Sequence, residues 1–414
     1  MYLILILFGS YFFISNLKNK KSINLYSWYI LGQIFFFVLP YSIIEIFNFE
    51  FKYNFSLEVK LKGWLILILS NLIIYIFYKL SYRINFNLKF NSLFLRLLNY
   101  ILIFLVLFSF LFAINNILSI GIENISNNNI LRSKISVLGP FSIILLLPIG
   151  YSTYFWIKFI NGDKSLKNFI SIFLFTFIAL IVAFSRGQRT DLILIPLLPI
   201  FYYFFKSRNF KILLYGFSGA LIICSYYATT LKTNLQNLNL NIVNAAIEIL
   251  KGDIDRNWTF WMAIDNTGFL TNKFMDNTFE GYIYTLFTFI PRSIAYFKGY
   301  STETWFVFNM GNYYESTWRV LSISDINWGV TLSGITEAII NGGIVGLLLY
   351  SIVMGLILKI IESFNQKYVY LNSILPFLVV LFSGYTFYNL LVIYVPIIMV
   401  LLILNQLDLK DKNK

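Results

Sequence analysis

Long apolar segments alternate with short polar ones along nearly the whole chain. Many windows run about 18 to 25 residues with little or no charge, the length that a helix needs to cross about 30 Å of hydrocarbon. Stretches such as Tyr100–Ile114 (YILIFLVLFSFLFAI) lack the alternation of polar and apolar positions found in the strands of a membrane barrel. The pattern therefore predicts an all-α polytopic membrane protein.

The apolar segments predict about eleven transmembrane helices. They lie near Tyr2–Leu17, Tyr26–Phe47, Trp64–Leu80, Leu97–Leu118, Val137–Ile157, Phe169–Phe184, Thr190–Phe205, Ile212–Thr230, Val330–Leu358, Ile374–Phe387 and Leu390–Asn405. The first has no basic segment before it and no clear cleavage site, so we interpret it as a span rather than a signal peptide.

These spans divide the chain into three parts. Residues 1–230 form an N-terminal bundle of about eight transmembrane helices. Residues 231–330 form one large extracytoplasmic loop with interfacial or re-entrant helices, because this segment is less apolar and rich in Asn, Thr, Tyr and Trp. Residues 331–414 hold the C-terminal transmembrane helices and a short cytoplasmic tail.

Charge sets the expected orientation. Of the 32 Lys and Arg residues, 18 lie in the C-terminal tail and in the loops after the first, third, fifth, seventh and ninth spans. Since basic loops stay in the cytoplasm, the long segment 231–330 is expected outside. The net charge of +13 therefore comes mostly from basic residues that keep the connecting loops in the cytoplasm. It does not indicate a nucleic-acid surface.

Arginine is distributed differently from lysine. Six of the nine arginines lie on the predicted outer side: Arg132, Arg186, Arg189, Arg256, Arg292 and Arg319. Arginine binds phosphate and carboxylate in a planar, bidentate way that lysine cannot match. This bias indicates an anionic ligand at the outer face.

Metal and nucleotide chemistry are disfavoured. The chain has no His and a single Cys, so the sequence disfavours a zinc site and excludes an internal disulfide. No phosphate-binding loop or dinucleotide fingerprint occurs, so a nucleotide donor is not expected. We expect no metal and no other cofactor.

The first of three motifs is SRGQRTD, residues 185–191. Arg186 and Arg189 share a face if the next helix has begun, Ser185 or Thr190 would cap that helix, and Asp191 lies in its first turn. A helix N-terminus with two guanidiniums would bind an anion. The alternative is a tight turn whose arginines reach the lipid headgroups or pair with Asp191.

The second motif is IPRSIAYFK, residues 290–298, with Arg292 and Lys298. Its alternative is a proline-broken interfacial helix with ordinary snorkelling cations. The third is GITEAIINGGIVG, residues 334–346, in which we expect Glu337 about two turns inside an uncharged span. Glu337 is either a base or a partner that holds an arginine, and the glycines permit close helix packing.

Aromatic residues gather in the long outer segment, as in RNWTFWM (256–262) and GNYYESTWR (311–319). Rings beside polar side chains suit sugars, whose CH groups stack on aromatics while hydroxyls form hydrogen bonds. The alternative is a belt of aromatics at the membrane interface.

The chain resembles the Wzy-type O-antigen and capsular polysaccharide polymerases, also called oligosaccharide repeat-unit polymerases. The resemblance rests on the order of these motifs, on about eleven spans and on one large outer loop. The resemblance implies a C-type glycosyltransferase fold in the bacterial cytoplasmic (inner) membrane, with an active site facing the periplasm or exterior. It implies that donor and acceptor are polyprenyl-diphosphate-linked oligosaccharides, joined without a metal. Membrane lipids and a chain-length regulator would be further partners.

The resemblance also implies roles for individual residues. Arg186, Arg189 and Arg292 would bind the diphosphate and stabilise it as it leaves. Glu337 and Asp191 would be the catalytic base candidates. The expected substrate-binding residues are Lys298, Arg256, Arg319, Trp258 and Tyr313.

Two other functions stay open. A flippase or transporter of lipid-linked oligosaccharides would also place cations among its helices, but internal pseudo-repeats would be expected and none is seen. The related O-antigen ligases use a histidine in the outer loop, and this chain has none.

Overall fold

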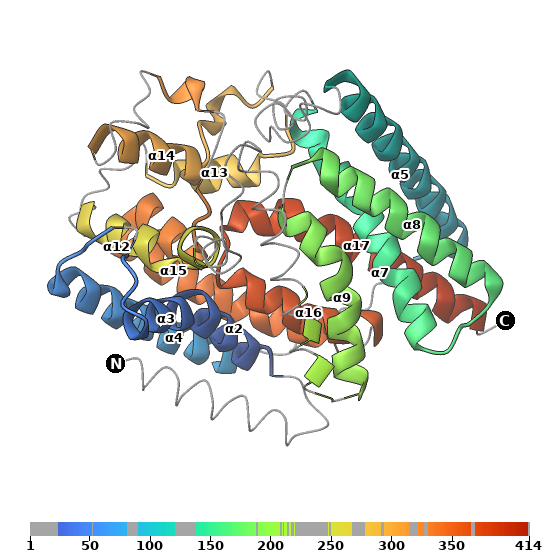
Figure 1. Ribbon diagram of the computed structural model, residues 1–414, viewed down its shortest axis with the longest axis horizontal. Coiled ribbons are helices and arrows are strands. Elements are labelled where there is room, and N and C mark those ends of the chain that lie inside the picture. Colours follow the sequence, from blue (N-terminus) through green and yellow to red (C-terminus); the bar gives the residue numbers. More distant parts are fainter. Residues whose placement is uncertain are drawn as a thin grey trace. The chain divides into compact units, whose positions relative to one another are not determined.

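The computed structural model of the chain is shown in Figure 1, and every regular element that it describes is helical. The structure describes residues 24–51, 53–80, 90–120, 138–187, 189–207, 209, 211–212, 215–216, 219, 247, 250–266, 278–290, 294–313, 322–326, 330–365 and 369–412.

The α-helices and the shorter helical turns follow one another along the chain. The α-helices are α2 (Leu25–Gln33), α3 (Leu39–Ile46), α4 (Leu57–Leu80), α5 (Ser92–Ile120), α7 (Leu147–Ile160), α8 (Leu166–Ser185), α9 (Arg189–Ser207), α12 (Asn257–Asn266), α13 (Glu280–Leu286), α14 (Thr302–Tyr313), α15 (Gly334–Asn365), α16 (Val369–Phe382) and α17 (Phe387–Lys412). Two π-helical turns are η1 (Ile34–Val38) and η4 (Leu250–Ile254). Three 3₁₀ turns are η3 (Gly139–Leu146), η5 (Tyr296–Lys298) and η7 (Ile323–Asp325).

Within the described part of the chain, 8 helices are long and apolar enough to cross a membrane. They are Leu25–Ile46, Leu57–Leu80, Ser92–Ile120, Phe141–Ile160, Leu166–Ser185, Thr190–Ser207, Gly334–Glu362 and Phe387–Leu409. Each coincides with a predicted span, which confirms a membrane-embedded helical protein. The predicted first span and most of the eighth lie outside the described residues. The predicted tenth corresponds to α16, which has only 14 residues.

The chain forms two compact units, each built from separate segments. Unit 1 comprises Met1–Asn85, Leu250–Phe364 and Leu378–Leu391, and unit 2 comprises Phe86–Ile249, Asn365–Phe377 and Val392–Lys414. The long segment 231–330 therefore contributes most of its described residues to the same unit as α2, α3, α4 and α15. The three-part division at residues 230 and 330 stays a prediction about topology.

Unit 2 is a bundle in which α7 packs against α8 and α9, while α5 packs against α8. The ring of Tyr151 stacks on Phe175 with centroids 4.9 Å apart, and its hydroxyl donates to Asn99 at 2.7 Å. Leu97, Phe104 and Leu111 project from α5 as exposed apolar side chains. Such a row is what a lipid-facing helix requires.

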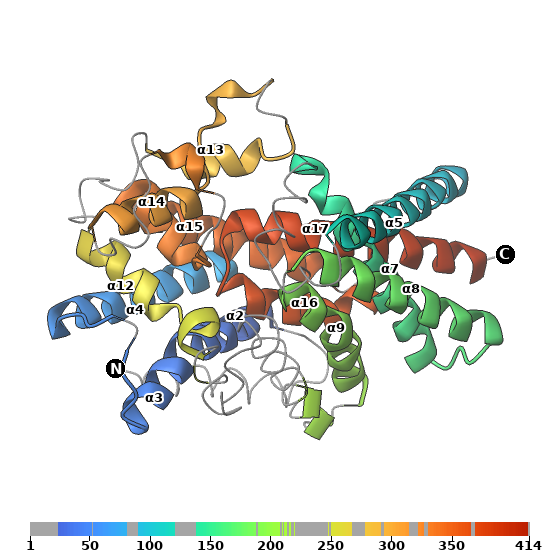
Figure 2. The ribbon, with the colours of Figure 1, turned by 45° about the horizontal axis from the view of Figure 1, so that its top comes forward.

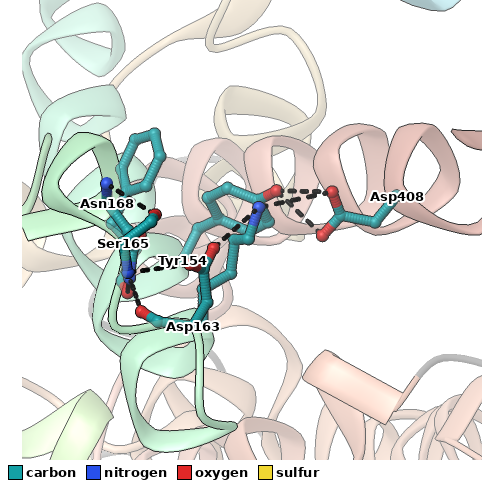
Figure 3. A network of polar contacts seen from close by, with 7 residues as sticks. Tyr154, Asp163, Ser165, Asn168 and Asp408 are labelled. Carbon is teal, nitrogen blue, oxygen red and sulfur yellow. Dashed lines mark hydrogen bonds and ion pairs between the residues drawn. The ribbon is translucent and has the colours of Figure 1, made fainter.

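Polar side chains gather at one end of unit 2 (Figure 3). The Tyr154 hydroxyl donates to both carboxylate oxygens of Asp408, at 2.9 and 2.8 Å. Lys158 lies 3.8 Å from Asp408 and 3.6 Å from Asp163, and Lys206 donates to the carbonyl of Ile160 at 2.6 Å. The C-terminal ends of α7, α9 and α17 thus lie together, as the charge bias predicts for three basic connections.

A similar cluster joins the ends of α4 and α15 in unit 1. The Tyr78 hydroxyl donates to Glu362 at 2.7 Å, and Lys359 lies 3.1 Å from the same carboxylate. These ends precede two further basic loops, so their proximity also agrees with the charge bias. Which of the two ends of each unit faces the cytoplasm stays a prediction.

The helices of unit 1 are interrupted at three places. The π turn η1 separates α2 from α3, and the carbonyl oxygens of Phe36 and Phe37 in it accept hydrogen bonds from residues 256 and 257. Residues 383–386 separate α16 from α17. Within α15, Gly342 and Gly343 leave helical geometry. Non-helical backbone at membrane depth is tolerated only where protein or water satisfies its polar groups.

The long segment packs on these interruptions and on α4. Helix α12 lies along α4 in Figure 1 and Figure 2. A Cβ atom added at Gly63 of α4 would be 2.7 Å from the Trp261 ring, so the glycine lets the two helices approach. Trp261 is buried. The RNWTFWM stretch is therefore a core element of unit 1.

Replacing Gly343 should destabilise the protein. Gly343 has φ 56° and ψ −133°, a conformation that side chains with a Cβ avoid. We expect Gly343→Ala to lower the free energy of unfolding by about 1–3 kcal/mol, measured by thermal unfolding in detergent. The control is Gly252→Ala, where an added Cβ meets nothing within 4 Å. Equal stability of the two variants would contradict the expected strain.

Cysteine labelling tests the shared end of unit 2. With Cys224 replaced by serine, we expect cysteines at Lys164 and Leu409 to react with a membrane-impermeant maleimide from the same side. A cysteine at Phe141, which precedes the opposite end of α7, should react from the other side. Labelling of Lys164→Cys and Leu409→Cys from opposite sides would be incompatible with the contacts of Asp408.

Candidate polar site of unit 1

The N-termini of three helices meet in unit 1. They belong to α14, which begins at Thr302, α15, which begins at Gly334, and α17, which begins at Phe387. The backbone N–H groups of a helix N-terminus are unpaired and carry partial positive charge, so they favour carboxylates. Two glutamates occupy this place.

Glu337 lies in the first turn of α15 and is 1% exposed. Its Oε2 accepts a hydrogen bond of 2.6 Å from the backbone N–H of Phe387, and Oε1 lies 3.5 Å from the Thr302 hydroxyl. The expectation that it lies two turns inside the helix is wrong. The hydroxyl of Ser333 accepts from the N–H of Thr336 at 3.1 Å, and this cap begins the helix at Gly334.

Asn341 stands one turn after Glu337, directly before the break in α15. Its amide nitrogen donates to the Thr302 hydroxyl and to the carbonyl of Glu337, both at 2.8 Å. Its carbonyl oxygens accept from the N–H groups of Tyr282 and Phe279. One side chain thus ties α13, α14 and α15 together, and its backbone carbonyl, freed by the glycine break, also finds a partner.

Glu303 follows Thr302 in the first turn of α14. Its Oε1 accepts from the Thr386 hydroxyl at 3.0 Å and from the Asn389 amide at 2.7 Å. Burial raises the pKa of Glu303 to about 7, although these two hydrogen bonds and the charge of Arg256 act in the opposite direction. The residue as a whole is half-buried. The charges of Glu303 and Glu337 are close enough to interact.

Arg256 is a buried cation near this site, and it is 1% exposed. Its Nε donates to the carbonyl of Gly384 at 2.8 Å, between α16 and α17. Its guanidinium carbon lies 5.5 and 5.7 Å from the ring centroids of Phe36 and Tyr385. Arg256 therefore supports two of the helix interruptions. The substrate-binding role that the family resemblance implies for Arg256 stays a prediction.

Lys298 and Trp258 are also buried in unit 1. The Lys298 ammonium donates to the carbonyl of Ile290 at 2.7 Å and lies 5.3 Å from the Tyr284 ring centroid. Trp258 packs between the rings of Tyr53 and Phe306. Trp258 therefore belongs to the packed interior of unit 1. This position differs from the two that we expected, a surface that stacks on sugars and an aromatic belt at the membrane interface.

The structure does not describe several of the expected site residues or their side chains. Arg292 and Arg319 fall in segments that the structure does not describe, and so do the side chains of Arg189 and Tyr313. Their expected roles stay predictions.

The SRGQR motif lies in unit 2 and forms a turn between two helices. Helix α8 ends at Ser185, Gly187 has φ 60°, and α9 begins at Arg189. Arg186 therefore precedes the helix that holds Arg189, and the two do not share one helical face. The Ser185 hydroxyl donates back to the carbonyl of Val182, so Ser185 does not cap α9. Asp191 does lie in the first turn of α9, as predicted.

Arg186 and Asp191 form a buried ion pair. The distance from Nη1 to Oδ2 is 3.1 Å, and the side chains are 4% and 0% exposed. Removing one partner of such a pair would leave an uncompensated charge. Arg186 is thus held by an ion pair with Asp191. The sequence had left this pairing open as an alternative to anion binding.

Two members of the unit 1 site were not found from the sequence, Glu303 and Asn341. Glu303 is one of several acids in the long segment, and nothing in its neighbours Thr302 and Thr304 sets it apart. Asn341 carried a usable signal, because it follows Glu337 by four residues and shares its helical face.

No group of three His, Cys, Asp or Glu side chains suited to a metal ion occurs among the described residues. Comparison of the chain with protein-family models, curated proteins and solved structures found no match. The residues of the unit 1 site define its chemistry. It is a pair of carboxylates, hydrogen-bonded at helix N-termini beside one arginine, and suited to exchanging a proton.

The raised pKa of Glu303 predicts a pH dependence of stability. Between about 4.5, the usual value, and about 7, the folded protein binds more protons than the unfolded chain. This contribution is complete below pH 4.5 and is lost as the pH rises through 7. We expect the unfolding temperature in detergent to fall from pH 5 to pH 7.5, and to fall less in Glu303→Gln. Asp265→Asn, an exposed carboxylate of α12, should keep the wild-type slope.

An identical slope in Glu303→Gln and wild type would mean that Glu303 does not titrate in this range. Asp255 has a pKa raised to about 6 by burial, and it accounts for a remaining slope of the same sign.

Proposed function

We propose that this protein is a membrane-embedded glycosyltransferase that polymerises polyprenyl-diphosphate-linked oligosaccharide repeat units at the outer face of the bacterial cytoplasmic membrane. The reaction transfers the growing chain from its lipid diphosphate to a hydroxyl of an incoming unit. It needs a group that accepts the hydroxyl proton and cations that stabilise the leaving diphosphate.

The observation that carries the proposal is the meeting of Glu303 and Glu337 in one polar site. Glu303 comes from the long segment that charge bias assigns to the outside, and Glu337 comes from a span. A carboxylate in a span is costly and usually functional. A site made jointly by a large outer segment and a broken span suits a lipid-linked substrate, because the reacting group of that substrate lies at the membrane surface.

The arginines support the proposal from the sequence. Six of nine lie on the predicted outer side, and among them Arg186 is held in place by Asp191. A guanidinium binds phosphate oxygens in a planar, bidentate way.

A second candidate is a transporter or flippase for lipid-linked oligosaccharides, and the helix interruptions of unit 1 favour it. Discontinuous helices whose termini face a buried polar site are typical of secondary transporters. The interruptions after Asn341 and at residues 383–386 meet this description. We rank it second because the motifs of the sequence follow the order expected for a polymerase.

Deletion of the gene and analysis of surface glycan on a gel separates the two functions. The polymerase predicts ladders with the wild-type gene and single repeat units after deletion. Arg186→Lys should abolish the ladder at normal protein level, because lysine keeps the charge beside Asp191 but loses bidentate binding of phosphate. The matched control is Arg96→Lys in α5, on the predicted cytoplasmic side, which should keep the ladder.

Loss of all surface glycan after deletion, single units included, would favour the flippase, because transport precedes polymerisation. Ladders that survive deletion in a strain without a second polymerase would refute the proposal. Full ladders with Arg186→Lys would remove Arg186 from the reaction and leave the polymerase function standing.

A further inference from the structure

Glu303 differs from Glu337 in how its carboxylate is used. Asp255 and Glu280 also accept through one oxygen only, but both are buried whereas Glu303 is half-buried. Both of its recorded hydrogen bonds, from Thr386 and Asn389, are to Oε1. No donor to Oε2 is recorded among the described residues. Glu337 instead uses both oxygens, for Phe387 and Thr302, and is 1% exposed. Glu303 thus keeps one oxygen for a further donor and is partly exposed.

The surroundings of Glu303 fix its orientation without neutralising it. Thr386 and Asn389 belong to the break before α17 and to its first turn, and the N–H of Asn389 itself donates to the Thr386 hydroxyl at 3.3 Å. Among the described residues, the charged and titratable groups that interact with Glu303 or with its neighbour Glu337 include Arg256 before α12 and Tyr388 in α17. None of them is recorded within ion-pair distance of Glu303 among the described residues.

The Tyr282 side chain places a further polar group beside Glu337. The Tyr282 hydroxyl is buried, has no hydrogen-bond partner within the described ranges, and interacts electrostatically with Glu337. Buried hydroxyl groups in native proteins are usually hydrogen-bonded. A ligand hydroxyl would supply the missing partner.

We propose that Glu303 is the catalytic base, which binds the acceptor hydroxyl through Oε2 and takes its proton, and that Glu337 is a positioning residue that holds the N-terminus of α17. This inference rests on the proposed polymerase function. Glu337 acts through Phe387, which adjoins the Thr386 side chain that orients Glu303.

The step balances without a metal or a redox partner. The acceptor O–H bond breaks, and its proton moves to Oε2 of Glu303. The oxygen then forms the bond to the anomeric carbon of the donor. The bond from that carbon to the diphosphate oxygen breaks, and its electron pair leaves with the lipid diphosphate. Glu303 later gives its proton to water.

The test measures chain growth in membranes that contain the full-length protein and accumulated lipid-linked repeat units. We expect Glu303→Gln to lower the initial rate by about 10²- to 10⁴-fold at normal protein level. Asp265→Asn, exposed on α12, should keep the wild-type rate. In the wild type the rate should rise with pH, reach half of its maximum near pH 7 and level off above it, and the residual rate of Glu303→Gln should lose this rise.

Chemical rescue separates a base from a structural residue. In Glu303→Ala, added formate should raise the rate at least about tenfold, because a small carboxylate can replace the missing base. Formate should not rescue Glu337→Ala, in which the hydrogen bond to Phe387 is lost. Wild-type activity of Glu303→Gln would overturn the inference. A second result would also overturn it: Glu303→Gln is slow but keeps the wild-type pH profile, and formate does not raise the rate of Glu303→Ala.

The proposed function and this inference fail in different ways. If wild-type membranes form no polymer from lipid-linked units, the polymerase function is wrong and the inference falls with it. If wild-type membranes form polymer and Glu303→Gln does so at the same rate, only the assignment of Glu303 is wrong.

Discussion

The hydrogen bond from the N–H of Phe387 to Glu337 links the parts of unit 1 that the site requires. A carboxylate buried in an apolar helix is unstable unless charge or hydrogen bonds compensate it. Here the compensation comes from the N-terminus of α17, and it exists only because α16 and α17 are separate helices. The cost of burying Glu337 and the cost of interrupting a helix inside the membrane therefore offset each other.

The same logic applies at the other two interruptions. The π turn at Ile34–Val38 frees carbonyl oxygens that residues 256 and 257 satisfy, and the glycine pair in α15 frees the carbonyl of Asn341 for Phe279. Each freed group is met by the long segment after residue 250. That segment is consequently part of the interior of unit 1. A substitution in it would alter the hydrogen bonds at the helix interruptions.

This arrangement bears on the proposed reaction. A base for an acceptor hydroxyl must be fixed in orientation, reachable, and able to change its protonation state near neutral pH. Burial alone lets a carboxylate change its protonation state near neutral pH, but it also makes the carboxylate unreachable for a substrate. Glu303 combines them because it stands at the start of α14, where three helix ends leave one carboxylate oxygen unused. Glu337, one turn from the glycine break, is fixed but not reachable.

Sequence alone determined the helical membrane class and the position of eight apolar helices, with ends up to seven residues from those observed, because these depend on local apolar length. The basic residues also indicated which helix ends lie together within each unit. The sequence also located Glu337 and the Arg186–Asp191 motif. Tertiary structure decided the rest. The interruption in α15 depends on the packing of Phe279 against Asn341 and Gly342, and no local pattern marks η1. Glu303, Asn341 and the structural role of Arg256 emerge only when segments far apart in the chain meet, since hydrogen-bond partners across a fold leave no periodicity in the sequence.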